Sequence, residues 1–498
     1  MVKKHHPLLL LIFSVFFFVV SCAKEKFSQG SFVIQDSVTT KALLQNETAG
    51  NSTSSAYVIN EDMVREYFKQ TSPEKRIDSI EPYSGLGTIP LYIVNFENGW
   101  NIVSSDSRSD FVLAKGENGI FELNKIHQGV RVWLDGMTEQ IKEFSESAST
   151  QVKEPQIWRE IRSKAHKDTL GNRALDPDQE YMWLVCLLSQ TDTTIVHNNI
   201  PHLLSTKWGQ GYPWNTHIPN NRLTGCAATA ISQVLYYFHS FTGVPSGLYH
   251  SISPYSYIDY DVWGYYRQYL VTRSDYTNNS PRWSQMPLDS LNSTTTTAGY
   301  VSDLMFDVGT RLGMIYGFSG LGGSSVTVTN QGYFDISSVN CEYDWDVLTD
   351  SLTTSVVNNL TIGKPIIVTS SYIPTTNNNY SGHTWVIDGC YQSTRTITRR
   401  YYYVKVPVED VIDYDENYFV IYRTSTLEDM LRIYPNFVEG TTQQSSTSTH
   451  TNYYRMNWGY NGRYDDGIYS MSVSSNWNAY AYGKAIHYNL VPGSLYIE

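Results

Sequence analysis

Residues 222–241 read RLTGCAATAISQVLYYFHSF, a glycine and a cysteine followed by small apolar residues and a longer apolar run. The spacing of the apolar residues predicts a helix, with Thr224 or Gly225 as the N-cap and Cys226 in the first turn. The apolar face of this helix comprises Ala227, Ala230, Ile231, Val234, Leu235 and Phe238. At a helix start, backbone N–H groups and the positive end of the helix dipole stabilise a thiolate, which attacks carbonyl carbons. A buried structural thiol is the alternative, and the segment alone does not separate the two.

A nucleophilic cysteine requires a base, and the chain has 12 histidines. His383 differs from the others by its surroundings in SGHTWVIDGC. Gly382 frees space on one side, and the run Thr384 to Ile387 predicts a buried strand. A strand start would hold an imidazole rigidly at the edge of a cleft. His383 is therefore the candidate base, with a satisfied structural histidine as the alternative.

Two further segments carry polar groups suited to such a site. WGQGYPWN contains Gln210, whose amide can donate to a developing oxyanion beside the backbone N–H of Cys226. RMNWGYNG contains Asn457 and Trp458. The asparagine oxygen can accept from the second nitrogen of a histidine, and the indole can shield that bond from water. Each segment is a weak signal when taken alone.

Taken together, these segments resemble the streptopain family of secreted bacterial cysteine peptidases. The motifs occur in the order QGYPWN, TGCAATAISQ, GHTWVIDG and NWGYNG. LYIVNFENGWNIVSSDSR, nearer the N-terminus, is similar to the propeptide segment of that family. DVGTRLGMIYGFSGLGGSS is similar to its second helix and glycine-rich loop.

The resemblance implies an α+β protein in which a small α+β propeptide domain precedes a papain-like peptidase domain. The cysteine would lie in the helical part of the peptidase domain and the histidine on its antiparallel sheet. The resemblance implies that Cys226 is the nucleophile, His383 the general base and then acid, and Gln210 an oxyanion donor. Asn457 and Trp458 would support the histidine. Peptide bonds would be hydrolysed through a thioester without a metal or organic cofactor, and the propeptide would inhibit its own zymogen.

The first residues predict export from a bacterial cytoplasm. MVKKHHPLLLLIFSVFFFVVSC has a basic start and an apolar stretch too short for a comfortable membrane span. It resembles a lipoprotein signal, in which Cys22 receives lipid and becomes the new N-terminus. A plain secretory signal or an uncleaved anchor is the alternative. We expect a lipoprotein of the outer membrane or cell surface, whose catalytic domain can leave the membrane once the propeptide is cut.

Composition argues against several other kinds of site. The formal net charge of −12 leaves no basic surface for nucleic acid. The chain has no paired Cys-x-x-Cys and no His-Glu-x-x-His to indicate zinc. The cysteines after Cys22 are too widely spread for a disulfide framework, and Cys186 and Cys390 lie in apolar runs typical of core thiols.

Changes in composition, together with the family resemblance, predict the domain organisation. We expect a signal peptide (1–22), a polar tether (23–56), the propeptide domain (57–165), an activation linker (166–197) and the catalytic domain (198–498). Two insertions relative to the family fall near 250–297 and 391–452. In the second we expect an extra hairpin or two and then a polar loop at TTQQSSTST. This second insertion follows the histidine strand and could narrow the cleft, form a subsite or bind a partner. Surface elaboration without a role in the chemistry is the alternative for both insertions.

Local patterns predict the elements of the propeptide domain. Residues 60–70 have helical spacing, and Asn98-Gly99 lies between two β-rich runs as a hairpin turn does. FVLAKGENGIFEL predicts a second hairpin. A second helix is predicted by the spacing of Val130, Trp133, Met137, Ile141 and Phe144.

Two other functions stay open from the sequence. A peptidase fold could have become a catalytically silent binding or inhibitory lipoprotein, although the presence of both Cys226 and His383 argues against this. The thiol chemistry could also be acyl or peptidyl transfer, which product analysis with an added amine would reveal.

Overall fold

The structure is a computed structural model, and the statements below concern the residues that it describes. These are residues 20–21, 57–85, 91–147, 154–155, 157–158, 161–162, 181–239, 255–260, 266–271, 283–312, 314–318, 323–326, 336–342, 350–372, 381–407, 419–421, 428, 432, 439–472 and 484–492. Cys22 lies outside these residues. None of the helices within them is long and apolar enough to cross a bilayer.

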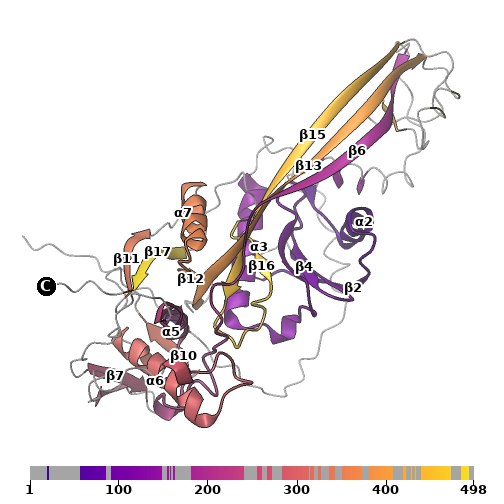
Figure 1. The fold of residues 1–498 in the computed structure, drawn as a ribbon. Helices are drawn as coiled ribbons and strands as arrows, with labels where there is room; N and C mark the ends of the chain where they lie inside the picture. Colours follow the sequence, from indigo (N-terminus) through magenta and orange to yellow (C-terminus); the bar gives the residue numbers. More distant parts are fainter. Residues whose placement is uncertain are drawn as a thin grey trace, which may run out of the picture.

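The N-terminal domain is a small antiparallel sheet covered by two helices (Figure 1). Its elements are α2 (Glu61–Thr71), β2 (Ile77–Tyr83), β3 (Leu91–Phe96), β4 (Trp100–Val103), β5 (Val112–Gly116), η2 (Leu123–Lys125) and α3 (Gln128–Ser147). The Asn60 side chain caps α2 by accepting from Met63 N at 2.9 Å. Gly99, with a φ of 89°, forms the predicted turn between β3 and β4. Both predicted helices and the first hairpin are therefore confirmed.

The second hairpin predicted at FVLAKGENGIFEL is wrong. β5 forms, but the residues after it are held by the buried Asn95 side chain instead of a partner strand. Phe121 N donates to Asn95 Oδ1 at 2.7 Å, and Asn95 Nδ2 donates to Phe121 O at 3.1 Å. Because one amide satisfies both main-chain groups of Phe121, no strand pairing is needed there.

The C-terminal domain has a helical part and an antiparallel sheet, as the sequence predicts. The helices are α5 (Cys226–His239), α6 (Thr295–Arg311) and α7 (Asp350–Thr361), with short η3 (Pro219–Asn221) and η4 (Trp283–Gln285). The large sheet includes β6 (Tyr181–Ile200), β11 (Ile336–Glu342), β12 (Ile366–Tyr372), β13 (Ser381–Pro407), β14 (Phe419–Ile421), β15 (Glu439–Asn457), β16 (Ile468–Tyr469) and β17 (Lys484–Pro492). A second sheet contains β1 (Val20–Ser21), β7 (Tyr255–Tyr260), β8 (Tyr266–Val271), β9 (Ile315–Phe318) and β10 (Gly323–Val326).

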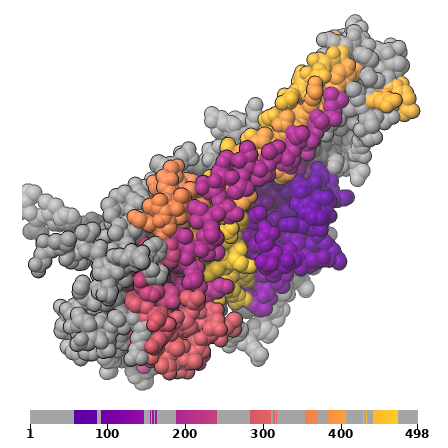
Figure 2. Space-filling model, viewed as in Figure 1, coloured from indigo at the N-terminus to yellow at the C-terminus, as the bar shows by residue number. Residues whose placement is uncertain are grey.

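The two domains share one sheet. β16 pairs with β5, so that the strand order runs β13-β15-β16-β5-β4-β3-β2. Tyr453 donates its hydroxyl to Val112 O at 2.8 Å, and Trp133 Nε1 donates to Ser470 O at 2.8 Å. Figure 2 shows the N-terminal domain packed against the C-terminal segment. The sheet contact places the start of α3 at the edge of the C-terminal domain.

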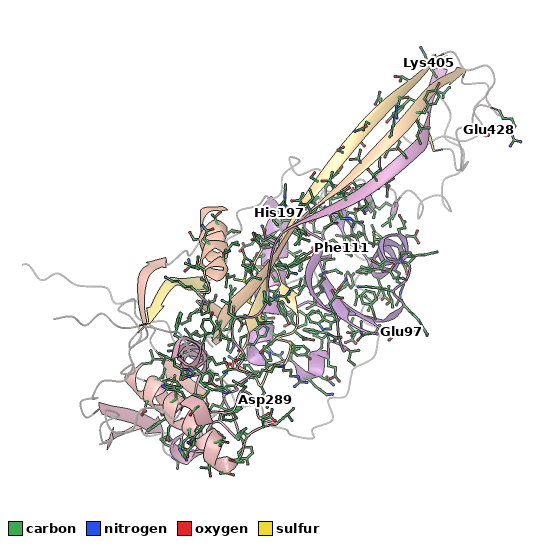
Figure 3. The ribbon with its side chains drawn as sticks, in the orientation of Figure 1. Glu97, Phe111, His197, Asp289, Lys405 and Glu428 are labelled. Atoms are coloured by element: carbon green, nitrogen blue, oxygen red, sulfur yellow. The ribbon has the colours of Figure 1, made fainter. Side chains whose placement is uncertain are left out.

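The strands β6, β13 and β15 extend together as a long arm (Figure 1). Figure 3 places Lys405 at its distal end and His197 near its base. The later part of the expected activation linker, from residue 181 to 197, therefore lies in β6, paired with the inserted part of β13. Residues 166–180 lie outside the described residues.

The predicted polar loop TTQQSSTST is wrong, because this segment is part of β15. Its hydroxyl groups pair across the strands, from Thr396 to Ser448 at 2.9 Å and from Thr398 to Ser446 at 3.0 Å. Threonine suits strands, and polar side chains suit an arm whose residues here are exposed.

Candidate active site

Cys226 is the first residue of α5 and is 2% exposed. Gly225, immediately before it, has a φ of 91°, which favours glycine. Thr229 N donates to Gly225 O at 3.0 Å and closes the first turn. The apolar face predicted for this helix is buried. The sulfur therefore lies at a helix N-terminus, as the sequence predicts.

His383 is fully buried near the start of β13, opposite Ser370 of β12. Its Nε2 lies 2.8 Å from the main-chain oxygen of Trp458. A carbonyl oxygen only accepts, so Nε2 carries the hydrogen of the neutral ring. Nδ1 is buried and has no hydrogen-bond partner. The ring is thus held in the tautomer whose Nδ1 can accept a proton.

Asn457 does not provide the acceptor expected from the sequence. Its Oδ1 accepts from Gln233 Nε2 at 2.9 Å and from Gly459 N at 3.2 Å. Its Nδ2 donates to Thr206 O at 2.8 Å. Asn457 therefore ties α5 to the end of β15, and the neighbouring main-chain carbonyl takes the histidine proton.

Trp458 has its indole fully buried between other aromatic rings. Its ring centroid lies 5.3 Å from that of Trp385 and 5.2 Å from that of Tyr469. The packed indole fixes the position of the residue whose carbonyl bonds to His383. Trp458 thus acts on the histidine through its main-chain oxygen, and its packed ring holds that part of the backbone in place.

Gln210 is 2% exposed, and neither atom of its side-chain amide has a hydrogen-bond partner. Its main-chain oxygen accepts from Thr224 N at 3.0 Å, two residues before Cys226. Gly209 beside it forms a β-bridge with Tyr460. Leaving a buried amide unsatisfied costs free energy, so a ligand oxygen in reach of its N–H would be stabilised.

The turn after β15 brings the motif segments together. Gly459 has a φ of 73°, and a Cβ added to it would lie 3.2 Å from Thr229 Cγ2 on α5. Asn461 N donates to Trp208 O at 3.3 Å, and Asn461 Oδ1 accepts from Trp214 Nε1 at 2.6 Å. The cysteine helix, the glutamine loop and the histidine support therefore meet at one junction.

Comparison with protein families gives two matches on this chain. Residues 208–469 match the peptidase C10 family, and residues 60–141 match the Spi protease inhibitor family. The first match spans more than half of the sequence. The chain belongs to the peptidase C10 family. It is a cysteine peptidase with an inhibitory propeptide domain upstream, so the resemblance to the streptopain family and the α+β class are confirmed.

A solved structure is also similar to this C10 peptidase. It is the active wild-type interpain A cysteine protease of Prevotella intermedia, with 23% sequence identity and a TM-score of 0.35. The similarity covers 58% of this chain and 94% of interpain A. Comparison with curated proteins gives no significant match.

The inhibitory domain lies directly on the histidine of this C10 peptidase. A Cβ added to Gly129, in the first turn of α3, would lie 2.5 Å from His383 Cδ2 and 2.7 Å from His383 Nε2. Gln128 Nε2 donates to Gly382 O at 3.4 Å. The start of α3 therefore covers the strand that carries His383.

His127 precedes α3 and packs beside the same site. Its ring stacks on Tyr460 with centroids 4.1 Å apart. Nδ1 accepts from Val130 N at 3.3 Å, and Nε2 donates to Arg463 O at 3.2 Å. The bond to Nδ1 requires the neutral ring, because a protonated Nδ1 cannot accept. Burial lowers the pKa of His127, and the neighbouring imidazole of His383 also lowers it.

Sequence reasoning missed several residues of this site. Gln233 and Tyr460 lie within the recognised motifs but had no assigned contact. His127 and Gly129 precede the apolar face of α3, where a glycine in the first turn was a usable signal. Asp465, which accepts from Trp458 N at 3.0 Å, had no signal in the sequence.

The remaining cysteine and metal expectations concern residues away from the junction. Cys390 is fully buried, as expected for a core thiol, and burial raises its pKa to about 11. The side chains of Cys186 and Cys341 lie outside the described residues. Within the described stretches, no three His, Cys, Asp or Glu side chains are grouped to hold a metal ion.

Proposed function

We propose that this C10 peptidase is an endopeptidase made as a zymogen, with Cys226 as its nucleophile and His383 as its general base. The observation that carries the assignment is the state of the His383 ring. Trp458 O accepts from Nε2, while Nδ1 is buried without a partner. A buried acceptor without a donor is costly unless it is used, and a thiol proton would satisfy it.

The reaction begins with proton transfer from Cys226 Sγ to His383 Nδ1. The thiolate, stabilised by the N-terminus of α5, attacks the carbonyl carbon of the peptide bond. The backbone N–H of Cys226 and the amide of Gln210 donate to the resulting oxyanion. His383 then gives its proton to the departing amine and leaves a thioester on Cys226.

Hydrolysis of the thioester completes the cycle. His383, neutral again, takes a proton from a water molecule, whose oxygen attacks the thioester carbonyl. The C–S bond breaks, the carboxylic acid leaves and the proton returns to Cys226. Throughout, the Trp458 carbonyl holds Nε2–H and stabilises the charged imidazolium.

The proposed latency is supported by the contact between α3 and His383. Gly129 lies against the imidazole edge, and His127 covers the ring of Tyr460. A substrate would need the same space, because it must reach both the sulfur and the imidazole. Removal of the propeptide domain is therefore required before a peptide can bind.

The proposed location is the outer membrane or cell surface, with Cys22 as a lipid anchor. The proposal is supported by the basic and apolar residues before Cys22. Because the anchor would belong to the propeptide side of the chain, a cut between the two domains would release the catalytic domain. Radiolabelled palmitate should label the unprocessed chain and not its Cys22→Ala variant.

The test of the catalytic assignment uses the chain after proteolytic removal of its propeptide. The processed protein should cleave casein and be labelled at Cys226 by an epoxysuccinyl thiol reagent. Cys226→Ala should abolish both. Cys390→Ala is a matched control, because its thiol is buried and has a raised pKa, and it should leave both intact. Failure of the processed parent in both assays would refute the assignment.

A further inference from the structure

The support of His383 depends on the backbone of Trp458, which is itself held by an acidic side chain. Asp465 Oδ1 accepts from Trp458 N at 3.0 Å. The oxygen of the same residue, Trp458, accepts from His383 Nε2 at 2.8 Å. One hydrogen bond on each side of a single residue therefore connects the carboxyl of Asp465 to the imidazole.

The turn between Trp458 and Asp465 is built to return the carboxyl to this position. Asn461 and Tyr464 have φ values of 58° and 62°, in the left-handed region that few residues other than glycine adopt. Asp465 N lies 3.4 Å from Gly462 O within the same turn. The backbone conformation of these residues brings Asp465, which is 7% exposed, beneath the end of β15.

Asp388, a buried acid nearby, makes different contacts. Asp388 accepts from His202 Nδ1 at 2.8 Å and from Leu204 N at 3.0 Å. Both contacts fix the segment that enters the catalytic domain, and neither involves Trp458. Asp388 is thus a natural comparison for Asp465, because both carboxyl groups are buried.

Burying a carboxyl group at the position of Asp465 costs free energy of folding. Burial raises the pKa of Asp465 to about 7, although the bond from Trp458 N and the nearby His202 oppose the rise. Protein interiors ordinarily exclude ionisable side chains that are not paired. A buried acid is therefore expected at functional sites more often than in hydrophobic cores.

We propose that Asp465 is a positioning residue for peptide hydrolysis, which fixes the Trp458 carbonyl and thereby holds His383 with Nδ1 available to Cys226. The inference rests on the catalytic roles proposed above. Asp465 touches neither substrate nor sulfur, so its effect is on the rate of the chemical steps and not on substrate binding. The rate depends on an acceptor oxygen at the position of Asp465 Oδ1, within hydrogen-bond distance of Trp458 N.

The test compares Asp465→Ala with Asp465→Asn in the processed enzyme. Without the acceptor, Trp458 can shift, and kcat should fall about 10- to 100-fold at an unchanged KM, because a small misplacement has a large cost. Asparagine keeps an acceptor oxygen at the same distance from the backbone, and it should restore kcat to within about threefold of the parent. Titration with the epoxysuccinyl reagent gives the concentration of active sites for each variant.

Asp388→Asn is the matched control. It removes a buried carboxylate from the same region and should lower thermal stability, while kcat per titrated site stays at the parental value. A structural role for Asp465 alone would give the same result in Asp465→Ala. If Asp465→Ala is not recovered folded, Asp465→Glu replaces it, since the extra methylene displaces the oxygen and should also lower kcat.

Two results would overturn the inference. The first is parental kcat in Asp465→Ala, or in Asp465→Glu where that variant is used. The second is an Asp465→Asn enzyme as slow as the variant without the acceptor, since the position of the oxygen would then be irrelevant. A parent enzyme that cleaves no casein after processing would instead refute the proposed function, and this outcome is read before any variant is compared.

Discussion

Replacing Gly129 by alanine should weaken the hold of the propeptide domain on the site. The added Cβ would lie 2.5 Å from His383 Cδ2, 2.7 Å from His383 Nε2 and 3.1 Å from Trp458 Cε3. These are atoms of two buried rings, not the ends of flexible side chains. The clash can therefore be relieved only by moving α3 or the rings.

The magnitude follows from the cost of overpacking. An extra methyl group in a closely packed interior costs about 1–3 kcal/mol. Alanine also favours the helix over glycine by about 1 kcal/mol, but α3 gains this whether or not it is docked, so the gain cancels in the docking equilibrium. The exposed form of the site should become about 5- to 150-fold more populated, since 1.4 kcal/mol corresponds to a factor of ten.

The assay is the initial rate at which an epoxysuccinyl reagent labels Cys226 in the unprocessed chain. The rate should rise in Gly129→Ala by the factor above. Gly136→Ala is the matched control, because Gly136 lies in the same helix and a Cβ there would meet no atom within 4 Å. Equal labelling rates in the two variants would refute the proposed contact between α3 and His383.

His127, Gln210 and Asn457 give further expected outcomes. Burial lowers the pKa of His127 when the propeptide domain is docked on the catalytic domain. The contribution of His127 to the docking free energy is therefore full above the ordinary histidine pKa, and it decreases as the pH falls below about 6.5. Labelling of the unprocessed chain, divided by that of the processed enzyme at each pH, should therefore rise toward pH 5, and His127→Asn should flatten this rise. Gln210→Ala should lower kcat about 100-fold with little change in KM, and a parental kcat would exclude an oxyanion contact. Asn457→Ala should lose about 1–3 kcal/mol of stability, because the buried Nε2 of Gln233 loses its acceptor, and calorimetry checks this. A kcat loss as large as that of Gln210→Ala would give Asn457 a catalytic part.

Much of the site was readable from the sequence because side-chain identity and spacing carry it. The helical period of residues 226–238 predicted the start of α5 under Cys226, and the apolar run after His383 predicted its buried strand. The partner of His383 was not readable, because a main-chain carbonyl is present at every residue. Asn457 was the side chain in the motif that could accept from His383, but its oxygen accepts from Gln233 Nε2 instead.

The arm was not readable for a different reason. Strands are recognised by apolar residues that alternate with polar ones, and TTQQSSTST has no such alternation. It becomes a strand because β13 supplies backbone partners and hydroxyl groups in register. The need for a glycine at position 129 was likewise not readable, because a Cβ there would clash with His383, which lies far away in the sequence.

The pairing of β6 with β13 determines how far a cut before β6 would lie from the active site of the same molecule. β6 has 20 residues and so spans about 60 Å. Its first residue, Tyr181, pairs with Pro407, two residues beyond Lys405, which lies at the distal end of the arm (Figure 3). A chain cut just before Tyr181 would be cut far from its own sulfur. Self-processing there would require the collision of two molecules, and its half-time would shorten as the zymogen is concentrated.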